Sequence, residues 1–277
     1  MANKDADTAE RSVTIQEYLR TREVNSRIQE LLRDRASSFI TTITSMVNQD
    51  EKLAKCEPKS LLMAALKAAA LNLPVDPNLG RAFIIPYKQK DGTYQAQLQL
   101  GWKAFVDLAQ RTGRFVRINA TAVKEGEIVA TNHLTGEITF DWKADREGLE
   151  TIGYAAYMEL DNGFKKEFYM TNKELGSHAT QYSKSYKYDK KGSLWATNYD
   201  AMAKKTVIKL MLSKYAPLST DMQQAQMVDQ AVIRDDYELD YVDNPSLDLP
   251  EPDHEEVDIN DDQINDMAKK LKGENDD

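Results

Sequence analysis

The sequence has very few of the residues that build disulfides and metal centres. Its single cysteine, Cys56, excludes an internal disulfide and makes a reducing compartment the simplest setting. Cys56 is most simply read as a small buried apolar residue. The three histidines, His133, His178 and His254, stand in unrelated contexts without ligand spacing or a partner cysteine. We therefore predict no metal ligand and no resident cofactor.

The sequence also lacks the segments that mark ATP-driven enzymes and membrane proteins. It contains no GxxxxGK[ST] phosphate loop, and no glycine-rich turn between a strand and a helix replaces one. The first twelve residues have no apolar core of the signal-peptide kind, and no apolar run approaches the length of a membrane span. We expect a cytoplasmic protein with no membrane contact, in which an ATP-driven mechanism lacks its usual parts.

A metal-dependent nuclease is the enzymatic alternative, and its signal is weak. Such an enzyme needs carboxylates that hold a divalent ion. The acid-x-Lys spacing found in some nucleases occurs here at residues 57–59, 141–143 and 189–191. A pattern that recurs by chance identifies no site. No catalytic residue is assigned, and the protein is predicted not to be an enzyme.

What the sequence does contain is a strong division of charge. The net charge of −9 combines residues 1–220, with 32 Lys and Arg against 26 Asp and Glu, and residues 221–277, with 4 against 19. The two parts therefore carry +6 and −15. A basic body is typical of proteins that bind nucleic acid, and an acidic extension of the same chain is a natural competitor for that surface.

Residues 221–277 have the composition of an interaction arm. They are rich in Asp, Glu, Gln and Pro and poor in apolar residues, which predicts a mostly disordered tail. Near its end, Ile264, Met267, Ala268 and Leu271 would share one face of a short amphipathic helix. Such an arm suits docking to a partner protein, and a purely solubilising tail is the alternative.

Apolar periodicity predicts two helices at the start of the chain. Within an N-terminal helical segment of residues 1–50, apolar spacings of three and four predict one helix of about six turns. Its stripe, which packs on its own domain or on a neighbouring subunit, is Ile28, Leu31, Leu32, Arg35, Phe39, Ile43 and Met46. A second helix begins near Pro58 and ends before Asn72 and Pro74; it is apolar on nearly all sides and should be buried.

Alternating apolar residues and hairpin turns predict antiparallel strands in the core, which spans residues 51–220. The turns Asp91-Gly92 and Asn162-Gly163 should join strands 82–87 with 94–100 and 154–160 with 164–170. Further strands are expected at 115–123, 128–131 and 138–142, and helices at 102–111 and 199–215. The fold class is therefore α+β, an antiparallel β-meander with flanking helices.

Two segments concentrate the positive charge of the body. Residues 81–118 hold seven basic residues against two acidic ones, and residues 184–215 hold eight against two. In the second segment lysines alternate with tyrosines ahead of Trp195. Cations neutralise phosphates and aromatic faces stack on bases, which holds single strands without reading their sequence. A solvated charged loop with incidental tyrosines is the alternative.

The helix expected at 199–215 carries two like charges on one face. Lys205 and Lys209 are one turn apart with no carboxylate near them in the sequence, so something anionic should neutralise them. Lys204 projects from the apolar side, where it must snorkel or find a partner.

In the helix expected at 102–111, Trp102 should pack in the core rather than stack on a base, and Asp107 can pair with Arg111 one turn away. Exposed cations around this helix are better phosphate contacts. The full set of candidate nucleic-acid contacts is Arg81, Lys88, Lys103, Arg111, Arg114, Arg117, Lys184, Lys187, Tyr188, Lys190, Lys191, Trp195, Lys205 and Lys209.

Several ordered blocks of residues resemble the RecT family of phage and prophage recombinases. They are CEPKSLL at 56–62 with Leu73-Pro74, GRAFIIPY at 80–87, GWKAFVDLAQRTG at 101–113, and Trp195 with MAKKT at 202–206. The resemblance covers roughly residues 30–218, and the acidic arm lies outside it.

The resemblance implies an ATP-independent single-strand annealing protein of homologous recombination. Such proteins bind single-stranded DNA, assemble into rings or helical filaments, and pair a complementary strand with the first into annealed duplex. They usually work with a phage exonuclease, and the arm is a candidate docking segment for that exonuclease or for a host single-strand-binding protein. The implied fold is an antiparallel sheet with helices that bound a basic DNA-binding groove. A passive single-strand nucleic-acid coat protein, which would share the groove without promoting pairing, is the alternative from another class.

Overall fold

The computed structural model describes residues 13–89, 91–143, 145–183, 186–187, 190–217, 219–229, 231–233 and 239–241. The chain divides into a first unit, Met1–Asp243, and a second unit, Asn244–Asp277. The second unit, with the amphipathic helix expected near Ile264, lies outside the described residues. The structural description below concerns the first unit.

The N-terminal segment is helical but is not one long helix. It comprises α1 (Ile15–Arg20), α2 (Arg22–Leu32), the short 3-10 helix η1 (Arg33–Arg35), α3 (Ala36–Gln49) and α4 (Glu51–Ala54). The single helix of about six turns is therefore wrong. Arg33 has a φ of +46°, which takes the backbone out of the right-handed helical region. After this break α1 and α2 both pack against α3, so Leu31 is left 53% exposed.

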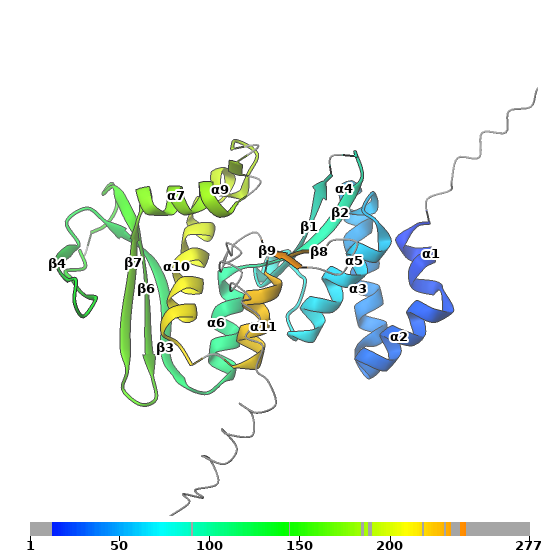
Figure 1. Ribbon diagram of the computed structural model, residues 1–277, viewed down its shortest axis with the longest axis horizontal. Helices are drawn as coiled ribbons and strands as arrows, with labels where there is room; N and C mark the ends of the chain where they lie inside the picture. The colour runs from blue at the N-terminus through cyan, green and yellow to red at the C-terminus, as the bar shows by residue number, and fades with distance from the viewer. Residues whose placement is uncertain are drawn as a thin grey trace, which may run out of the picture. The chain divides into compact units, whose positions relative to one another are not determined.

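The buried second helix and the first hairpin are confirmed. Helix α5 (Pro58–Ala70) has proline in its first turn and packs against a two-stranded sheet of β1 (Ala82–Lys88) and β2 (Tyr94–Leu100) (Figure 1). Two contacts tie the helix to β2: the Glu57 backbone N–H donates to the Tyr94 carbonyl at 2.8 Å, and the Ala96 backbone N–H donates to Ser60 Oγ at 2.9 Å. The 3-10 helix η2 (Pro77–Leu79) leads into β1.

The remaining strands are antiparallel but do not form one meander. A three-stranded sheet has the order β3 (Phe115–Lys124), β6 (Thr151–Leu160) and β7 (Lys165–Thr171). Strands β4 (Ile128–Asn132) and β5 (Glu137–Phe140) pair only with each other among the described residues. The predicted meander is wrong at this point because β3 pairs along nearly its whole length with β6, which places the β4–β5 hairpin outside the sheet.

Helix α10 (Tyr199–Tyr215) packs across all three strands of this sheet and against α6 (Trp102–Arg111) (Figure 1). Its apolar arc is buried as predicted, since Ala203, Val207 and Ile208 are inaccessible to solvent. Two polar residues on the opposite side of the helix are buried as well. Lys205 is 4% exposed and Thr206 is 6% exposed.

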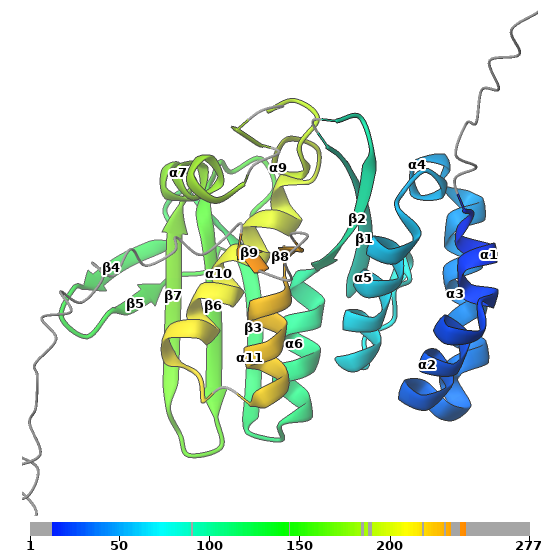
Figure 2. The same cartoon turned by 45° about the vertical axis from the view of Figure 1, so that its right-hand side comes forward.

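The other elements that the structure describes in the first unit are α7 (Asn172–Tyr182), α9 (Leu194–Thr197), α11 (Thr220–Val228), and the paired short strands β8 (Ala231–Ile233) and β9 (Leu239–Tyr241). Helix α11 lies beside α6 in both Figure 1 and Figure 2. The boundary expected at residue 220 therefore falls at the start of a helix that packs on the core, because Met222 and Ala225 are buried there. None of the described helices is long and apolar enough to cross a bilayer.

Candidate nucleic-acid interface

Six of the predicted contacts are exposed cations. Lys88 ends β1, Lys103 lies in the first turn of α6, and Arg114 follows that helix. Lys187, Lys190 and Lys191 lie between α7 and α9. Within the part of the chain that the structure describes, none of the six forms an ion pair with a carboxylate. The Lys190 ammonium lies 5.1 Å from the centre of the Tyr186 ring. Exposed cations of this kind suit the neutralisation of phosphates.

Lys184 and Tyr188 belong to the same lysine and tyrosine stretch, but they lie outside the described residues. The other predicted contacts have structural partners. Three of them are arginines whose guanidinium groups pair with carboxylates. Arg81 Nε lies 2.8 Å from Asp107 Oδ2, Arg111 pairs with the same carboxylate at 3.0 Å, and Arg117 pairs with Glu159.

Arg111 connects α6 to the chain that follows α5. Its pairing with Asp107 was predicted, and its guanidinium also donates to the carbonyls of Leu71 at 2.8 Å and Asn72 at 3.0 Å. With its donors engaged in this way, Arg111 holds two elements together. Arg117 differs because its side chain stays 67% exposed beside Glu159.

Lys205 and Lys209 are neutralised by a carboxylate that is distant in the sequence. Asp229, directly after α11, lies 2.9 Å from Lys205 Nζ and 3.2 Å from Lys209 Nζ. Its Oδ1 also accepts a hydrogen bond of 2.9 Å from the Leu100 backbone N–H at the end of β2. Burial raises the pKa of the Asp229 carboxyl, but the charges of the two lysines and these hydrogen bonds outweigh it and hold the pKa below its usual value. The anion expected to neutralise these two lysines is therefore a carboxylate of the protein itself.

The structure also shows where the side chains of Lys204, Trp102 and Trp195 lie. Lys204 has a partner, since its Nζ lies 2.8 Å from Asp200 one turn earlier. Trp102 packs partly buried against the core, as predicted. Trp195 is 5% exposed and makes edge contacts with Tyr186 and Tyr199. The ring of Trp195, a predicted DNA contact, therefore packs inside the protein in this conformation.

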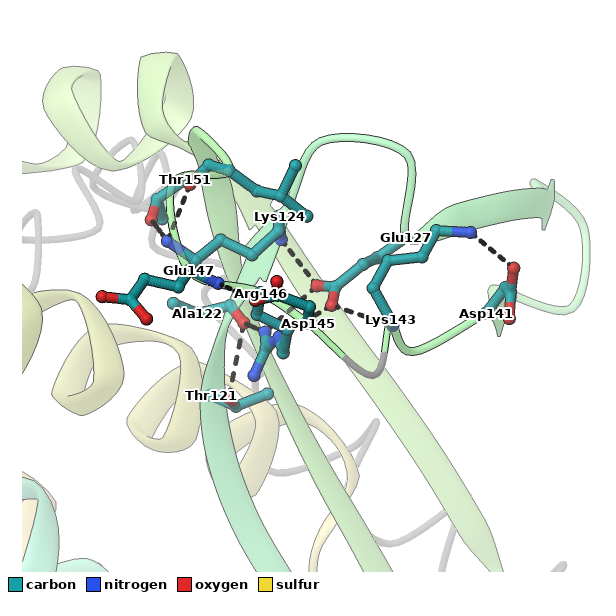
Figure 3. Close-up of polar contacts among 11 residues, drawn as sticks. Thr121, Ala122, Lys124, Glu127, Asp141, Lys143, Asp145, Arg146, Glu147 and Thr151 are labelled. Carbon is teal, nitrogen blue, oxygen red and sulfur yellow. Dashed lines mark hydrogen bonds and ion pairs between the residues drawn. The ribbon is translucent and has the colours of Figure 1, made fainter.

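A buried polar cluster at the base of the β4–β5 hairpin was not found from the sequence (Figure 3). The Glu127 carboxylate is inaccessible to solvent and accepts hydrogen bonds from Arg146 Nε at 2.7 Å and from the Lys124 backbone N–H at 2.7 Å. Arg146 also donates to the Ala122 carbonyl of β3. These contacts fix the hairpin to the end of the sheet. Glu127 and Arg146 are 19 residues apart and share no local pattern that could have revealed the pair.

An aromatic platform beside this cluster was also missed. The rings of Phe140 and Trp142 stack with their centres 4.7 Å apart, and the Arg146 guanidinium lies 5.4 Å from the centre of the Trp142 ring. Together with residues of β3 and β6, these side chains line a hollow of about 810 Å³. Trp142 is 48% exposed. Among the described residues, no three His, Cys, Asp or Glu side chains gather in a group that could hold a metal ion.

Comparison with known proteins shows which family the chain belongs to. The model of the RecT family matches residues 37–244. The chain is 37% identical over 278 residues to a Bacillus subtilis (strain 168) protein named "Uncharacterized protein YqaK", a match that covers 94% of each chain. It is also 26% identical over 198 residues to "Protein RecT" of Escherichia coli (strain K12), covering 70% of this chain and 71% of that protein. The family match takes in the sheet, α6, α10 and α11 together, and the chain therefore belongs to the RecT family.

Proposed function

We propose that the chain binds single-stranded DNA through its exposed cations and pairs a complementary strand with it, without ATP. Membership of the RecT family supports a single-strand annealing protein of recombination in general. The observation that carries the proposal is the match of residues 37–244 to that family. The six exposed cations, which have no carboxylate partner among the described residues, are the part of this chain that suits the role.

The mechanism is electrostatic. Two DNA strands repel each other through their phosphates, and this repulsion slows pairing. Lys103, Arg114 and Lys191 would neutralise phosphates and leave base edges free. The protein then supplies charge and alignment, while base pairing supplies specificity. No group on the protein needs to make or break a covalent bond, so we propose that it is not an enzyme.

The set of contacts is narrower than the one read from the sequence. We propose Lys88, Lys103, Arg114, Lys187, Lys190 and Lys191 as direct phosphate contacts, together with Lys184 and Tyr188 of the same stretch. Arg81 and Arg111 act indirectly because they hold α6 in place through Asp107. Arg117 can reach a phosphate from beside Glu159, since most of its side chain is exposed.

The test is an annealing assay with two complementary oligonucleotides, the protein, a chelator and no nucleotide. We expect pairing to run faster than in buffer. A passive coat protein, the alternative function, would bind each strand and slow pairing, so the direction of the rate change separates the two. If pairing ran no faster with the protein than in buffer, the proposal that the protein promotes annealing would be wrong.

The proposal extends to partners. We propose that the protein assembles into a ring or helical filament of identical subunits, with contacts from its N-terminal helices, and that the acidic arm docks an exonuclease or a host single-strand-binding protein. Electron microscopy with the two strands added in sequence tests the assembly. Particles that stay monomeric on DNA would contradict it.

A further inference from the structure

The hydrogen-bond donors around Asp229 form a binding site for an anion. Three parts of the chain supply its donors: the Leu100 backbone N–H at the end of β2, and the Lys205 and Lys209 ammonium groups of α10. The carboxylate of Asp229 is fully buried among them, and the Lys205 side chain is only 5% exposed. Two ammonium groups and a backbone N–H are donors that suit a phosphate as well as a carboxylate.

The helix that carries Asp229 is lightly attached. Among the described side chains of the nine-residue helix α11, only Met222 and Ala225 are buried apolar groups. The side-chain nitrogen of Gln226 is buried and has no hydrogen-bond partner among the described residues. A buried donor without a partner disfavours the docked position. Segments with few buried contacts are the ones that open locally in folded proteins.

The site also lies close to a proposed DNA contact. Leu100 is three residues before Lys103, so at most about 11 Å of backbone separates its N–H from the exposed lysine. Helix α10, which carries the two ammonium groups, packs against α6, which carries Lys103. A DNA strand held by Lys103 therefore passes near the site that Asp229 fills.

We propose that Leu100, Lys205 and Lys209 form an anion site that Asp229 fills in the DNA-free chain and that a backbone phosphate of single-stranded DNA fills when α11 moves away. The inference rests on the proposed function. Asp229 acts as an internal competitor for DNA, and α11 is the displaceable element that carries it. The two lysines then contact phosphate only in the open form.

The first test compares Asp229→Asn with Asp221→Asn. Both remove one negative charge from the same segment, but Asp221 is exposed on α11 and lies outside the site. Binding to a labelled single strand is measured by fluorescence anisotropy over a range of salt concentrations. We expect D229N to bind at least about threefold more tightly than wild type, with a salt slope steeper by about one unit. The slope rises because, without the Asp229 carboxylate, a phosphate adds a contact at the site instead of replacing the one made by Asp229.

The second test does not involve DNA. Thermal unfolding of wild type, D229N and D221N is measured in phosphate and in chloride at equal ionic strength. Phosphate should raise the melting temperature of D229N more than that of the other two proteins, because only D229N has lost the resident anion. If annealing fails while this selective stabilisation holds, the proposed function is wrong but the anion site stands.

A third variant covers the case in which D229N does not fold. Met222→Ala weakens the attachment of α11 and leaves all three donors and Asp229 in place, so it should also bind single-stranded DNA more tightly. The proposal is overturned if M222A, or a D229N that unfolds cooperatively as a folded protein does, binds DNA more weakly than wild type. It is equally overturned if D229N matches D221N, or if phosphate stabilises all proteins alike. Asp229 would then be a structural clamp with no part in DNA binding.

Discussion

Glu127 is a buried carboxylate whose charge is matched by neighbouring donors. Arg146 donates to both of its oxygens, at 2.7 and 3.0 Å, and the Lys124 backbone N–H adds a third hydrogen bond (Figure 3). Burial by itself would raise the pKa of this carboxyl. The hydrogen bonds and the positive charge of Arg146 reverse that effect and lower the pKa below its usual value.

Glu127→Gln should destabilise the protein. The change removes the charge that Arg146 neutralises and replaces one acceptor oxygen by a donor that faces other donors. We expect the free energy of unfolding to fall by about 2 kcal/mol, measured by urea denaturation at pH 7. The matched control is Glu125→Gln, since Glu125 is exposed two residues away.

The same variant gives a pH dependence with a defined sign. A carboxyl whose folded-state pKa is lowered stabilises the protein above its unfolded value of about 4.3, and that contribution is lost as the pH falls through the folded-state pKa. The stability difference between wild type and E127Q should therefore shrink in acid. A difference that stays constant from pH 7 to pH 3 would contradict the ionised state of Glu127.

Among the elements, the break between α2 and α3 decides how the N-terminal segment packs. The backbone of Arg33 has φ +46° and ψ −118°, a region that glycine occupies far more readily than other residues. The Arg33 side chain is exposed and makes no ion pair among the described residues. The position therefore stores backbone strain with no ion pair among the described residues to offset it.

Arg33→Gly should stabilise the protein by about 1 kcal/mol, because glycine relieves that strain. Thermal or urea unfolding measures the change. In a continuous helix of six turns the same substitution would place glycine in the helix interior and lower stability by a similar amount. The sign of the effect thus separates the two structures of this segment, and a destabilised R33G would contradict the break.

Elements set by local chemistry were predictable from the sequence, and those set by distant pairing were not. Proline at the start of α5 and the turn Asp91-Gly92 mark their boundaries within a few residues. The pairing of β3 with β6 joins residues such as Ala120 and Ala156, and nothing near either strand specifies that choice over the nearer β4. The prediction of a single meander was wrong for this reason.

At the scale of the whole molecule, the sequence predicted which segments carry positive charge. It did not predict which individual cations in those segments are exposed and available to bind DNA. Lys103 and Lys205 look alike in sequence, yet Lys103 is exposed and Lys205 is buried beside Asp229. The carboxylate that neutralises Lys205 lies 24 residues further along the chain, in a region whose composition suggested disorder. Burial and distant partners decided which lysines remain available.

Deleting residues 244–277 tests the division of charge across the chain. These residues carry 12 acidic and 3 basic side chains, so their removal changes the net charge from −9 to zero and leaves α11 and Asp229 in place. We expect tighter binding of single-stranded DNA, most clearly at low salt, where the charges are least screened. Anisotropy titrations at low and high salt measure it. An unchanged salt profile would leave the arm a role in partner docking or solubility only.

In the function that we propose, exposed cations of this chain speed the pairing of complementary strands without ATP. The most direct measurement is the annealing rate of two complementary oligonucleotides in stopped flow, with chelator present and nucleotide absent. We predict a rate above that in buffer for wild type and for the control Lys55→Gln, whose exposed lysine lies outside both basic segments, and a lower rate for Lys103→Gln. A wild-type rate equal to or below that in buffer would contradict the account.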